Sequence, residues 1–451
     1  MGNFEKRPVL HFSPRGGWIN DPNGLTYDGK RYHLYAQHNP EDIVWGPMHW
    51  LHATSGDLLA WEEHGVALFP DDLGTAFSGS VVIDGQNTAG FGAGAMVAVY
   101  TQHGDSERQS IAYSTDGMRF TPYAGNPVID NPGIPDFRDP KVFWNERKQC
   151  WCMALAAGAA VEFYRSANLR EWSKTGAFEK AGPAQTFECP DLFMLPAPDG
   201  RMVWVLTCSL IAPPESGGGR MRYFLGEYDG QAFCAWEGYE EGLPLDEGPD
   251  DYAGATFNGA QERIYLGWAA NPVYAGKVPA CGYRGHMTLP RRLSLVDTTA
   301  GLRLAAEPAL GVVFSEAKGA GSSLPAGAYE IRAEGGGPFE LSLENRIGEA
   351  FRFGLNEQGE IFADRTRAGN SSFDGWFASP LYSVARKARV TTGPFQMRLI
   401  VDGPIVELYA ERGAYVNTML VFPKESYSEI RARGSVGLKI LLYAKPHEPE
   451  K

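Results

Sequence analysis

Apolar residues along this chain fall in short runs that turn-forming residues interrupt, which is the pattern expected of β-strands. Two such runs cover residues 110–113 and 161–164. A turn signal, Asp or Asn four residues before an aromatic, recurs at intervals of 59, 52 and 61 residues. Its copies are Asp57 and Trp61, Asp116 and Phe120, Asn168 and Trp172, and more faintly Asp229 and Phe233. Each copy predicts a strand, a turn started by the Asx side chain, and a return strand fixed by the aromatic ring.

A second repeat interleaves with the first. Residues 137–143 (FRDPKVF) match residues 187–193 (FECPDLF) at an offset of 50, and residues 20–25 are a looser copy. Residues 77–82 and 252–257 occupy the corresponding places in the remaining units. Five strand starts and four turns at this period predict a five-bladed β-propeller.

The repeat stops near residue 300. A Gly/Ser-rich joint follows at residues 317–327, and alternating apolar and polar runs then appear at 339–344, 395–401 and 405–409. Such runs are typical of half-buried antiparallel strands, so a β-sandwich is expected. The predicted fold is therefore all-β, with a five-bladed propeller at residues 1–298, a linker at 299–324 and a β-sandwich at 325–451.

Composition and charge narrow the choice of partners. The 451 residues suffice for two domains, and the net charge of −13 argues against nucleic acid or an anionic membrane as a partner. A neutral substrate is compatible with that charge, and the sequence leaves a homo-oligomer open. The acidic stretch 237–251 is interpreted as a solvated loop. No apolar run approaches the length of a membrane span.

Neither the first residues nor the cysteines predict targeting or a cofactor. No apolar segment follows Met1–Arg7, so no signal peptide is expected and the cytoplasm is the default location; a trimmed chain would fit a secreted protein. The six cysteines form no C-x-x-C pair, and no Cys/His cluster has the spacing of zinc ligands. We expect neither a metal nor another cofactor.

Three acidic residues lie at or next to matched places in the repeat: Asp139 aligns with Cys189, so Glu188 comes one residue earlier on a similar strand. The first strand of each propeller blade lines the central channel, so Asp21, Asp139 and Glu188 should meet there from three different blades. Bringing like charges together costs free energy, which makes a purely structural role for all three hard to accept. Cleavage of a glycosidic bond needs one ionised and one protonated carboxyl group, and crowded carboxyls raise one another's pKa. The three acids are therefore candidate catalytic residues.

Sugar-binding side chains are expected around these acids. Arg138 adjoins Asp139 and offers a planar set of donors to sugar hydroxyls. Aromatic rings stack on the apolar faces of sugars. The candidates for such platforms are Trp18, Trp45, Trp50, Phe77 and Trp268.

At these residues the sequence resembles glycoside hydrolase family 32, the family of invertases, levanases and inulinases. The motif W-I-N-D-P-N-G occupies residues 18–24, R-D-P residues 138–140 and E-C-P-D residues 188–191. Weaker matches at 364–369 and 399–407 reach the second domain, so the resemblance spans nearly the whole chain. Residues 67–77 and 84–91 resemble the levanase and inulinase branch.

The resemblance implies a retaining, exo-acting β-fructofuranosidase that hydrolyses terminal β-D-fructosyl units of fructans, fructooligosaccharides or sucrose. It implies that Asp21 is the nucleophile, Glu188 the general acid/base and Asp139 a residue that grips fructosyl hydroxyls and stabilises the transition state. It also implies a fructosyl pocket lined by Asn20, Gln37, Trp45, Phe77, Ser78, Arg138 and Trp268. Leu51 and Ala36 depart from the family pattern, which leaves the preferred chain length of the substrate open.

Three other functions were weighed. A fructosyltransferase on the same scaffold would pass the fructosyl unit to a sugar, and the sequence does not separate it from a hydrolase. The motifs at 18–24 and 188–190 argue against an inverting propeller glycosidase that acts on pentosans. All three acids are present, which argues against an inactive glycan-binding propeller. Cys189 has no His partner at a motif spacing, so thiol catalysis is not expected.

Overall fold

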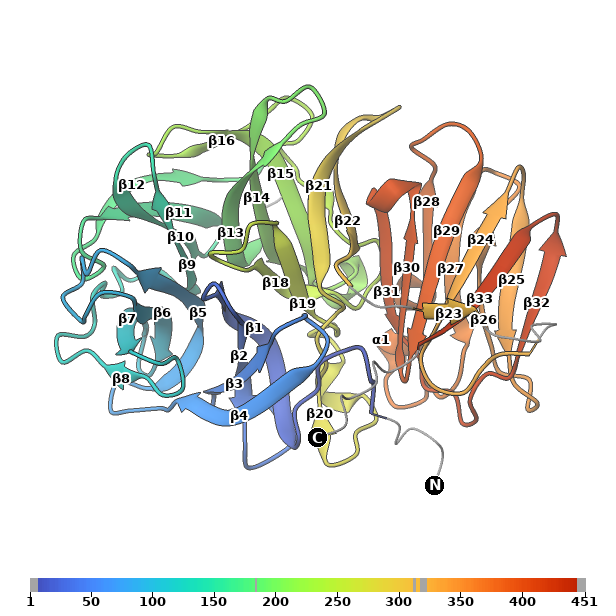
Figure 1. Ribbon diagram of the computed structural model, residues 1–451, viewed down its shortest axis with the longest axis horizontal. Helices are drawn as coiled ribbons and strands as arrows, with labels where there is room; N and C mark the ends of the chain where they lie inside the picture. The colour runs from blue at the N-terminus through green and yellow to red at the C-terminus, as the bar shows by residue number, and fades with distance from the viewer. Residues whose placement is uncertain (1–6, 183–184, 311–313, 317–322, 444–451) are drawn as a thin grey trace.

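The computed structural model describes residues 7–182, 185–310, 314–316 and 323–443, and nearly all of its regular elements are β-strands. Strands up to residue 308 form five sheets, and two further sheets follow. None of the helices in the described ranges is long and apolar enough to cross a membrane. Figure 1 shows the first five sheets around a common centre, with the last two packed beside them.

The five sheets are the blades of a β-propeller, each with its strands in sequence order from the channel outward. The first blade contains β1 (Gly17–Tyr27), β2 (Tyr32–Asn39), β3 (His49–Ser55) and β4 (Trp61–Leu68), with the short β20 (Tyr283–Arg284) parallel to β1. The second contains β5 (Thr75–Asp84), β6 (Ala95–His103), β7 (Glu107–Ser114) and β8 (Thr121–Pro122). The third contains β9 (Phe137–Asn145), β10 (Cys150–Ala157), β11 (Ala160–Ser166) and β12 (Ser173–Phe178).

The fourth and fifth blades complete the ring. The fourth contains β13 (Thr186–Pro196), β14 (Met202–Ile211), β15 (Arg220–Tyr228), β16 (Phe233–Ala235) and β17 (Leu243–Pro244). The fifth contains β18 (Tyr252–Thr256), β19 (Ile264–Trp268), β21 (Arg291–Thr298) and β22 (Gly301–Pro308). Contacts run from β1 to β5, β9, β13, β18 and back to β1, so these innermost strands enclose the channel.

The turn repeat lies between the third and fourth strands of the first four blades, as the sequence predicts. The Asp57 carboxylate accepts hydrogen bonds from the backbone N–H groups of Leu59 and Ala60, at 2.9 and 2.8 Å. The indole of Trp61 donates to the carbonyl of Leu58 at 3.1 Å and closes the same turn. Asn168 and Trp172 repeat both contacts in the third blade. The local chemistry of the repeat therefore forms the turn in the blades that carry the signal.

The second domain is a β-sandwich, which confirms the predicted fold class. Two short helices, α1 (Gly375–Ala378) and α2 (Pro380–Ser383), precede β28. One sheet has the order β23 (Phe314–Glu316), β33 (Gly437–Tyr443), β24 (Tyr329–Gly335), β29 (Phe395–Asp402), β30 (Ile405–Ala410) and β31 (Tyr415–Leu420). The other has the order β28 (Val384–Ala388), β27 (Glu360–Arg367), β26 (Ala350–Leu355), β25 (Phe339–Glu344) and β32 (Glu429–Gly434). Apolar residues of both sheets form its core.

The propeller extends further than the predicted boundary at residue 298. β22 pairs with β21 along its whole length, so the fifth blade ends at Pro308. The fifth blade has a tight turn between Thr298 and Gly301 in place of the Asx–aromatic signal, which explains why the repeat did not reveal its last strand. The predicted linker at 299–324 thus includes β22 and β23, and its residues 311–313 and 317–322 lie outside the described ranges.

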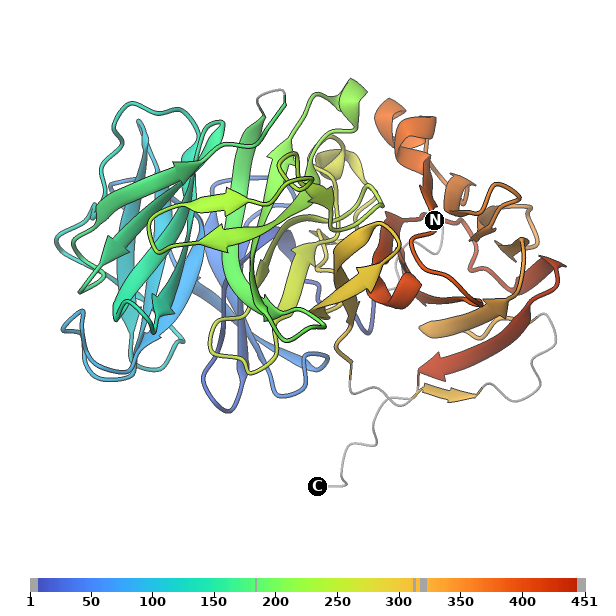
Figure 2. The same ribbon diagram turned by 90° about the horizontal axis from the view of Figure 1, so that it is seen from above.

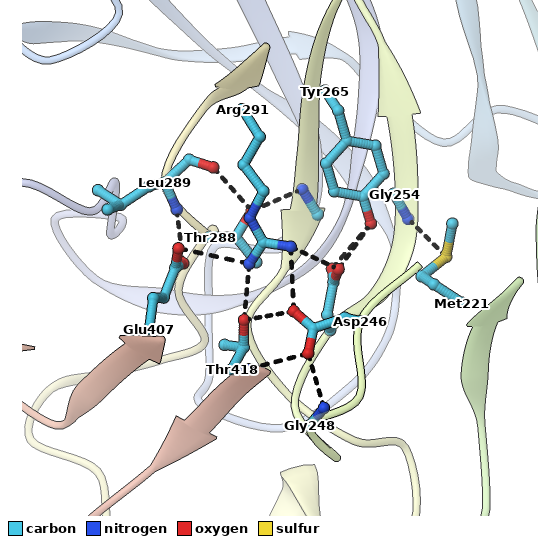
Figure 3. A network of polar contacts seen from close by, with 12 residues as sticks. Met221, Asp246, Gly248, Gly254, Tyr265, Thr288, Leu289, Arg291, Glu407 and Thr418 are labelled. Atoms are coloured by element: carbon cyan, nitrogen blue, oxygen red, sulfur yellow. Dashed lines mark hydrogen bonds and ion pairs between the residues drawn. The ribbon is translucent and has the colours of Figure 1, made fainter. Parts of the chain in front are cut away.

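A buried ionic network joins the two domains, as Figure 3 shows. Arg291 of β21 is fully buried and forms ion pairs of 3.0 Å with Asp246 and with Asp251. It also lies 3.4 Å from Glu407 of β30 and donates to Thr418 of β31 at 2.6 Å. Arg291 therefore connects the fifth blade to the sandwich beside it, which the two views in Figures 1 and 2 place next to each other.

This network corrects the interpretation of residues 237–251 as a solvated loop for the second half of the stretch, whereas Glu237 and Glu241 are exposed as expected. Asp246, Asp250 and Asp251 are each at most 2% exposed. Asp250 pairs with Arg365 of the sandwich, as Asp246 and Asp251 pair with Arg291. A cluster of acids without nearby Lys or Arg in the sequence looked solvated because its cationic partners come from residues far along the chain. Buried charges require such partners.

Candidate active site

A β-bulge interrupts each of the five innermost strands at the same level of the channel. In each strand two residues oppose a single residue of the next strand outward: 20–21 in β1, 77–78 in β5, 139–140 in β9, 189–190 in β13 and 253–254 in β18. Asp139, Cys189 and Ala253, the first residues of their bulges, have positive φ angles of 67°, 46° and 53°. Bulges re-aim side chains, and strained backbone of this kind is often found at functional sites.

A cavity of about 380 Å³ lies at the level of these bulges. All ten residues predicted for the site line it: Asn20, Asp21, Gln37, Trp45, Phe77, Ser78, Arg138, Asp139, Glu188 and Trp268. Its wall is completed by Trp18, Val44, Tyr252, Pro272, Ala275 and Gly276. The structure thus brings together side chains that are separated by almost 250 residues in the sequence.

Asp21 is held by short hydrogen bonds on both of its oxygens. Asn20 Nδ2 donates to Oδ1 at 2.8 Å, and Ser78 Oγ donates to Oδ2 at 2.6 Å. The indole of Trp18 donates to Asn20 Oδ1 at 2.8 Å and so orients the amide that contacts Asp21. Donors from two blades therefore fix the carboxylate while it still lines the cavity.

Asp139 is the most buried of the three acids, with 5% of its surface exposed. Its Oδ2 accepts a hydrogen bond of 3.0 Å from the backbone N–H of Cys189, and Cys189 Sγ lies 3.5 Å from Oδ2 of both Asp139 and Asp21. Burial raises the pKa of Asp139 to about 8; the neighbouring Arg138 opposes this rise, while Glu188 and Asp21 add to it. Burial also raises the pKa of the Cys189 thiol well above its usual value, so the thiol stays protonated.

Glu188 has a different partner on each oxygen. Arg138 donates to its Oε1 from both Nε, at 3.1 Å, and Nη2, at 2.9 Å, while the hydroxyl of Tyr252 donates to Oε2. Burial raises the pKa of Glu188, Arg138 opposes this rise and Asp21 adds to it. The carboxyl group can therefore hold a proton when Asp21 is charged and release it when that charge is removed.

Arg138 is itself anchored away from the cavity. Its Nη1 lies 2.9 Å from Glu107 Oε1 and 2.6 Å from Asp136 Oδ1. Carboxylates around it raise its pKa even though burial lowers it, so the guanidinium remains charged. The sequence analysis did not identify Glu107 or Asp136 as site residues, because both act on Glu188 through Arg138 and carry no motif of their own.

The aromatic residues divide into an exposed rim and a buried wall. Trp45 is 56% exposed and meets Phe77 edge-to-face at 5.7 Å, and Phe77 stacks on His103 with ring centres 4.4 Å apart. Trp18 and Trp268 are almost fully buried in the wall, 5.9 Å apart. Trp50 is not a sugar platform: it is completely buried and donates its indole N–H to the carbonyl of Phe77. It therefore supports the backbone under Phe77.

Tyr252 is a site residue that the sequence analysis placed at the start of a repeat unit, residues 252–257, without giving it a role in the site. It begins β18 and is 3% exposed. Its position at the start of a repeat unit, aligned with the starts of the other innermost strands, was the available signal.

Within the described ranges, no group of three or more His, Cys, Asp or Glu side chains is arranged to hold a metal ion.

The comparisons with known proteins identify the class. The sequence model of the glycosyl hydrolases family 32 N-terminal domain matches residues 11–308, and that of the family 32 C-terminal domain matches residues 297–440. A five-sheet propeller with acids at its channel, followed by a sandwich, is the fold and site of a glycoside hydrolase. The chain belongs to glycoside hydrolase family 32.

Relatives with assigned names agree with this membership. The chain is 38% identical over 473 residues to the levanase of Bacillus subtilis (strain 168), covering 96% of this chain and 69% of the relative. It is 34% identical to the extracellular exo-inulinase inuE of Aspergillus niger, covering 92% of this chain and 89% of the relative.

Solved structures show the same architecture. The exo-inulinase from Aspergillus awamori superposes with a TM-score of 0.88 at 31% identity, covering 98% of this chain and 99% of that one. The β-fructofuranosidase from Schwanniomyces occidentalis, complexed with fructosyl-erythritol, gives 0.85 at 29% identity, covering 97% of both chains. The chain is therefore a glycoside hydrolase with β-fructofuranosidase activity.

Proposed function

We propose that the protein removes terminal β-D-fructosyl units by a retaining double displacement, with Asp21 as nucleophile and Glu188 as general acid/base. The observation that carries this assignment is the pair of environments in one cavity. Asp21 receives hydrogen bonds on both oxygens. Glu188 lies between the guanidinium of Arg138 and the hydroxyl of Tyr252, and burial raises the pKa of Glu188. A retaining glycosidase needs one ionised and one protonated carboxyl group placed in this way.

In the first step, Glu188 donates its proton to the glycosidic oxygen while Asp21 Oδ attacks the anomeric carbon of the fructosyl unit. The leaving group departs with that proton, and an ester bond joins Asp21 to the sugar. Glu188 is left as a carboxylate, which the two N–H groups of Arg138 stabilise directly.

The second step reverses these roles. Esterification removes the negative charge of Asp21, which is one of the causes that raise the pKa of Glu188. The pKa of Glu188 therefore falls in the intermediate, and its carboxylate can accept a proton from the attacking water. Cleavage of the ester releases fructose and restores both carboxyl groups.

Asp139 is assigned to binding and to stabilisation of the transition state. It lines the cavity beside the other two acids, and the backbone N–H of Cys189 fixes its orientation. A carboxyl group so placed can bind fructosyl hydroxyls and strengthen those bonds as positive charge develops on the sugar. Its replacement should lower kcat while the retained configuration of the product is unchanged.

Trp45 is placed to contact the part of the substrate that leaves. It is the exposed member of the aromatic set, and its contact with Phe77 holds it at the edge of the cavity. The cavity has room for a terminal sugar, and the exposed ring offers a platform for the next unit. This arrangement supports exo cleavage of fructans, fructooligosaccharides or sucrose. In the alternative function, a fructosyltransferase, a sugar takes the place of water as the acceptor of the fructosyl unit.

The test compares Asp21→Asn with Glu188→Gln on two substrates. Asp21→Asn should lose roughly three or more decades of kcat on sucrose and on an activated aryl fructoside, because both need the nucleophile. Glu188→Gln should be partly spared on the aryl fructoside, whose leaving group needs little protonation. The assignment would be overturned if Glu188→Gln lowered kcat equally on both substrates, or if Asp21→Asn kept more than a tenth of wild-type activity. Product analysis at high sucrose concentration separates hydrolysis from transfer.

A further inference from the structure

A second and larger cavity, of about 920 Å³, opens at the other end of the propeller channel. The catalytic acids lie near the starts of the innermost strands, whereas this cavity is lined by residues near the ends of those strands and in the turns after them. All five blades contribute to its lining. Residues 143–148, 191–194 and 258–260 form most of its wall.

Side chains in the middle of the channel separate the two cavities. The amide of Asn258 donates to the carbonyls of Val81 and Val142, at 2.9 and 3.1 Å, and so ties three blades together. The buried Lys141 pairs with Asp191 at 3.1 Å at the same depth. The larger cavity is therefore a site of its own and does not continue the fructosyl pocket.

The floor of this cavity contains both acidic and basic groups. Thr256 donates its hydroxyl to Asp191 Oδ2 at 2.7 Å, and the same hydroxyl accepts a bond of 3.2 Å from Arg263 Nη1. Asp191 is 1% exposed, so it shapes the floor from below, and the polar groups that a ligand can reach come from Arg263 and from the turns at the mouth. Arg263 lies over the ring of Phe193, at 4.9 Å, and has further N–H groups on its guanidinium.

The walls are aromatic. Phe143, Trp144 and Trp204 are half-buried, so part of each ring remains accessible at the cavity. They are held by edge contacts: Trp204 meets Tyr228 at 5.1 Å, and Trp144 meets Trp151 at 5.0 Å. Rings that are fixed in this way can receive an apolar ligand face without a large loss of side-chain entropy.

The charges at the mouth are of both signs. Glu146 and Asp229 stand with Arg147 and Lys148 in the exposed turns of the third and fourth blades. An anion would meet Asp191, Glu146 and Asp229, and a cation would meet Arg263, Arg147 and Lys148. These three acidic and three basic side chains balance, so the lining has no net charge that would select an anion or a cation.

We propose that this cavity is a second, non-catalytic binding site for a neutral saccharide. A sugar hydroxyl can donate to a carboxylate and accept from a guanidinium at the same time, and a sugar ring has an apolar face that packs on Trp204 or Trp144. The volume is within the range of small-molecule sites. On a polymeric substrate, such a site would increase the local concentration of chain ends.

The test counts binding sites by calorimetry. Asp21→Asn protein, which should bind without turnover, is titrated with 1-kestose, with maltotriose and with inorganic phosphate. We expect two classes of site for 1-kestose, of which Trp45→Ala weakens one and Trp204→Leu the other, by roughly tenfold for the loss of one stacking ring. Binding of maltotriose would extend the site to saccharides in general. A single class that Trp45→Ala abolishes, or displacement by phosphate, would overturn the proposal.

Two controls keep this result separate from misfolding and from the catalytic assignment. Trp236→Leu removes a half-buried indole outside both cavities and should leave both classes unchanged. If Trp204→Leu lowers the thermal midpoint strongly, Arg263→Met at the floor supplies the same test without loss of a ring. In the enzyme with Asp21 intact, Trp204→Leu should raise KM for inulin and leave kcat/KM for sucrose unchanged. A second site that neither Trp204→Leu nor Arg263→Met weakens would contradict the proposed location.

Discussion

Asp139→Asn tests how much folding free energy the site gives up to hold its carboxyl groups together. Asp139 is 5% exposed, and burial raises its pKa to about 8 from an ordinary value of 3.8. Asparagine has nearly the same shape and can still accept the hydrogen bond from Cys189 N–H. The substitution therefore removes the ionisable group with little change in packing.

The magnitude follows from the two pKa values. Because the folded-state pKa lies above the unfolded one, the contribution to stability is fully present below about pH 4 and is lost as the pH rises towards 8. At about 1.4 kcal/mol per unit of pKa, the wild type loses roughly 3 kcal/mol by pH 6 and roughly 5 kcal/mol by pH 8. The variant lacks this loss. For a propeller of this size, roughly 5 kcal/mol corresponds to about 8 °C in Tm.

The assay is thermal unfolding of both proteins between pH 4 and pH 8. The Tm of Asp139→Asn minus the Tm of the wild type should increase steadily from pH 4 to pH 8. The kcat of the variant should be lower than that of the wild type. Asp199→Asn, at an exposed turn whose carboxylate is 61% accessible, is the matched control and should show no pH-dependent difference. A constant difference in Tm from pH 4 to pH 8 would refute the idea that burial of Asp139 costs stability.

Three further predictions concern the proton donor, the domain interface and metals. Tyr252→Phe removes a donor that stabilises the ionised form of Glu188, so the pKa of Glu188 should rise and the alkaline limb of kcat/KM should move up by roughly one pH unit; an unchanged profile would contradict this. Arg291→Met leaves Asp246 and Asp251 without their cation and should cost about 3–5 kcal/mol in denaturant unfolding, whereas Arg292→Met on the surface should cost about 1 kcal/mol or less. Activity should survive exhaustive EDTA treatment, and a requirement for an added divalent cation would be inconsistent with a reaction carried out by two carboxyl groups.

Local chemistry explains what could be predicted from the sequence. The Asx turn at Asp57 is made by atoms within three residues of one another, so its copies reveal the blades without any knowledge of their packing. The three acids could be placed because equivalent positions in a repeat lie at equivalent depths. Seven of the ten predicted site residues lie on the innermost strands β1, β5, β9 and β13. The other three, Gln37, Trp45 and Trp268, were predicted as pocket residues from the resemblance to the family.

Contacts between distant segments explain what could not be predicted. Glu107 acts on the site from another blade through its contact with Arg138, and its sequence neighbours suggest no such role. Tyr252 donates to Glu188 across blades, and only its place in the repeat pointed to the channel. The burial of Asp246 and Asp250 depends on arginines 45 and 115 residues away. Sequence neighbours determine whether an acid looks solvated, but spatial neighbours determine whether it is.

The prolines of the acid motifs connect the sequence to the geometry of the site. An Asp-Pro pair is most often part of a turn, yet Pro140 and Pro190 lie inside β9 and β13, and Pro22 lies inside β1. A proline cannot donate to a strand ladder and is tolerated in a strand chiefly at an edge or a bulge. Pro140 and Pro190 occupy the second position of their bulges, and Pro22 directly follows one. Pro22 and Pro140 therefore mark where the strand loses its regular pairing, and the acid directly before each, Asp21 or Asp139, turns into the cavity. In β13 the bulge follows Glu188, which is still paired with Ser209.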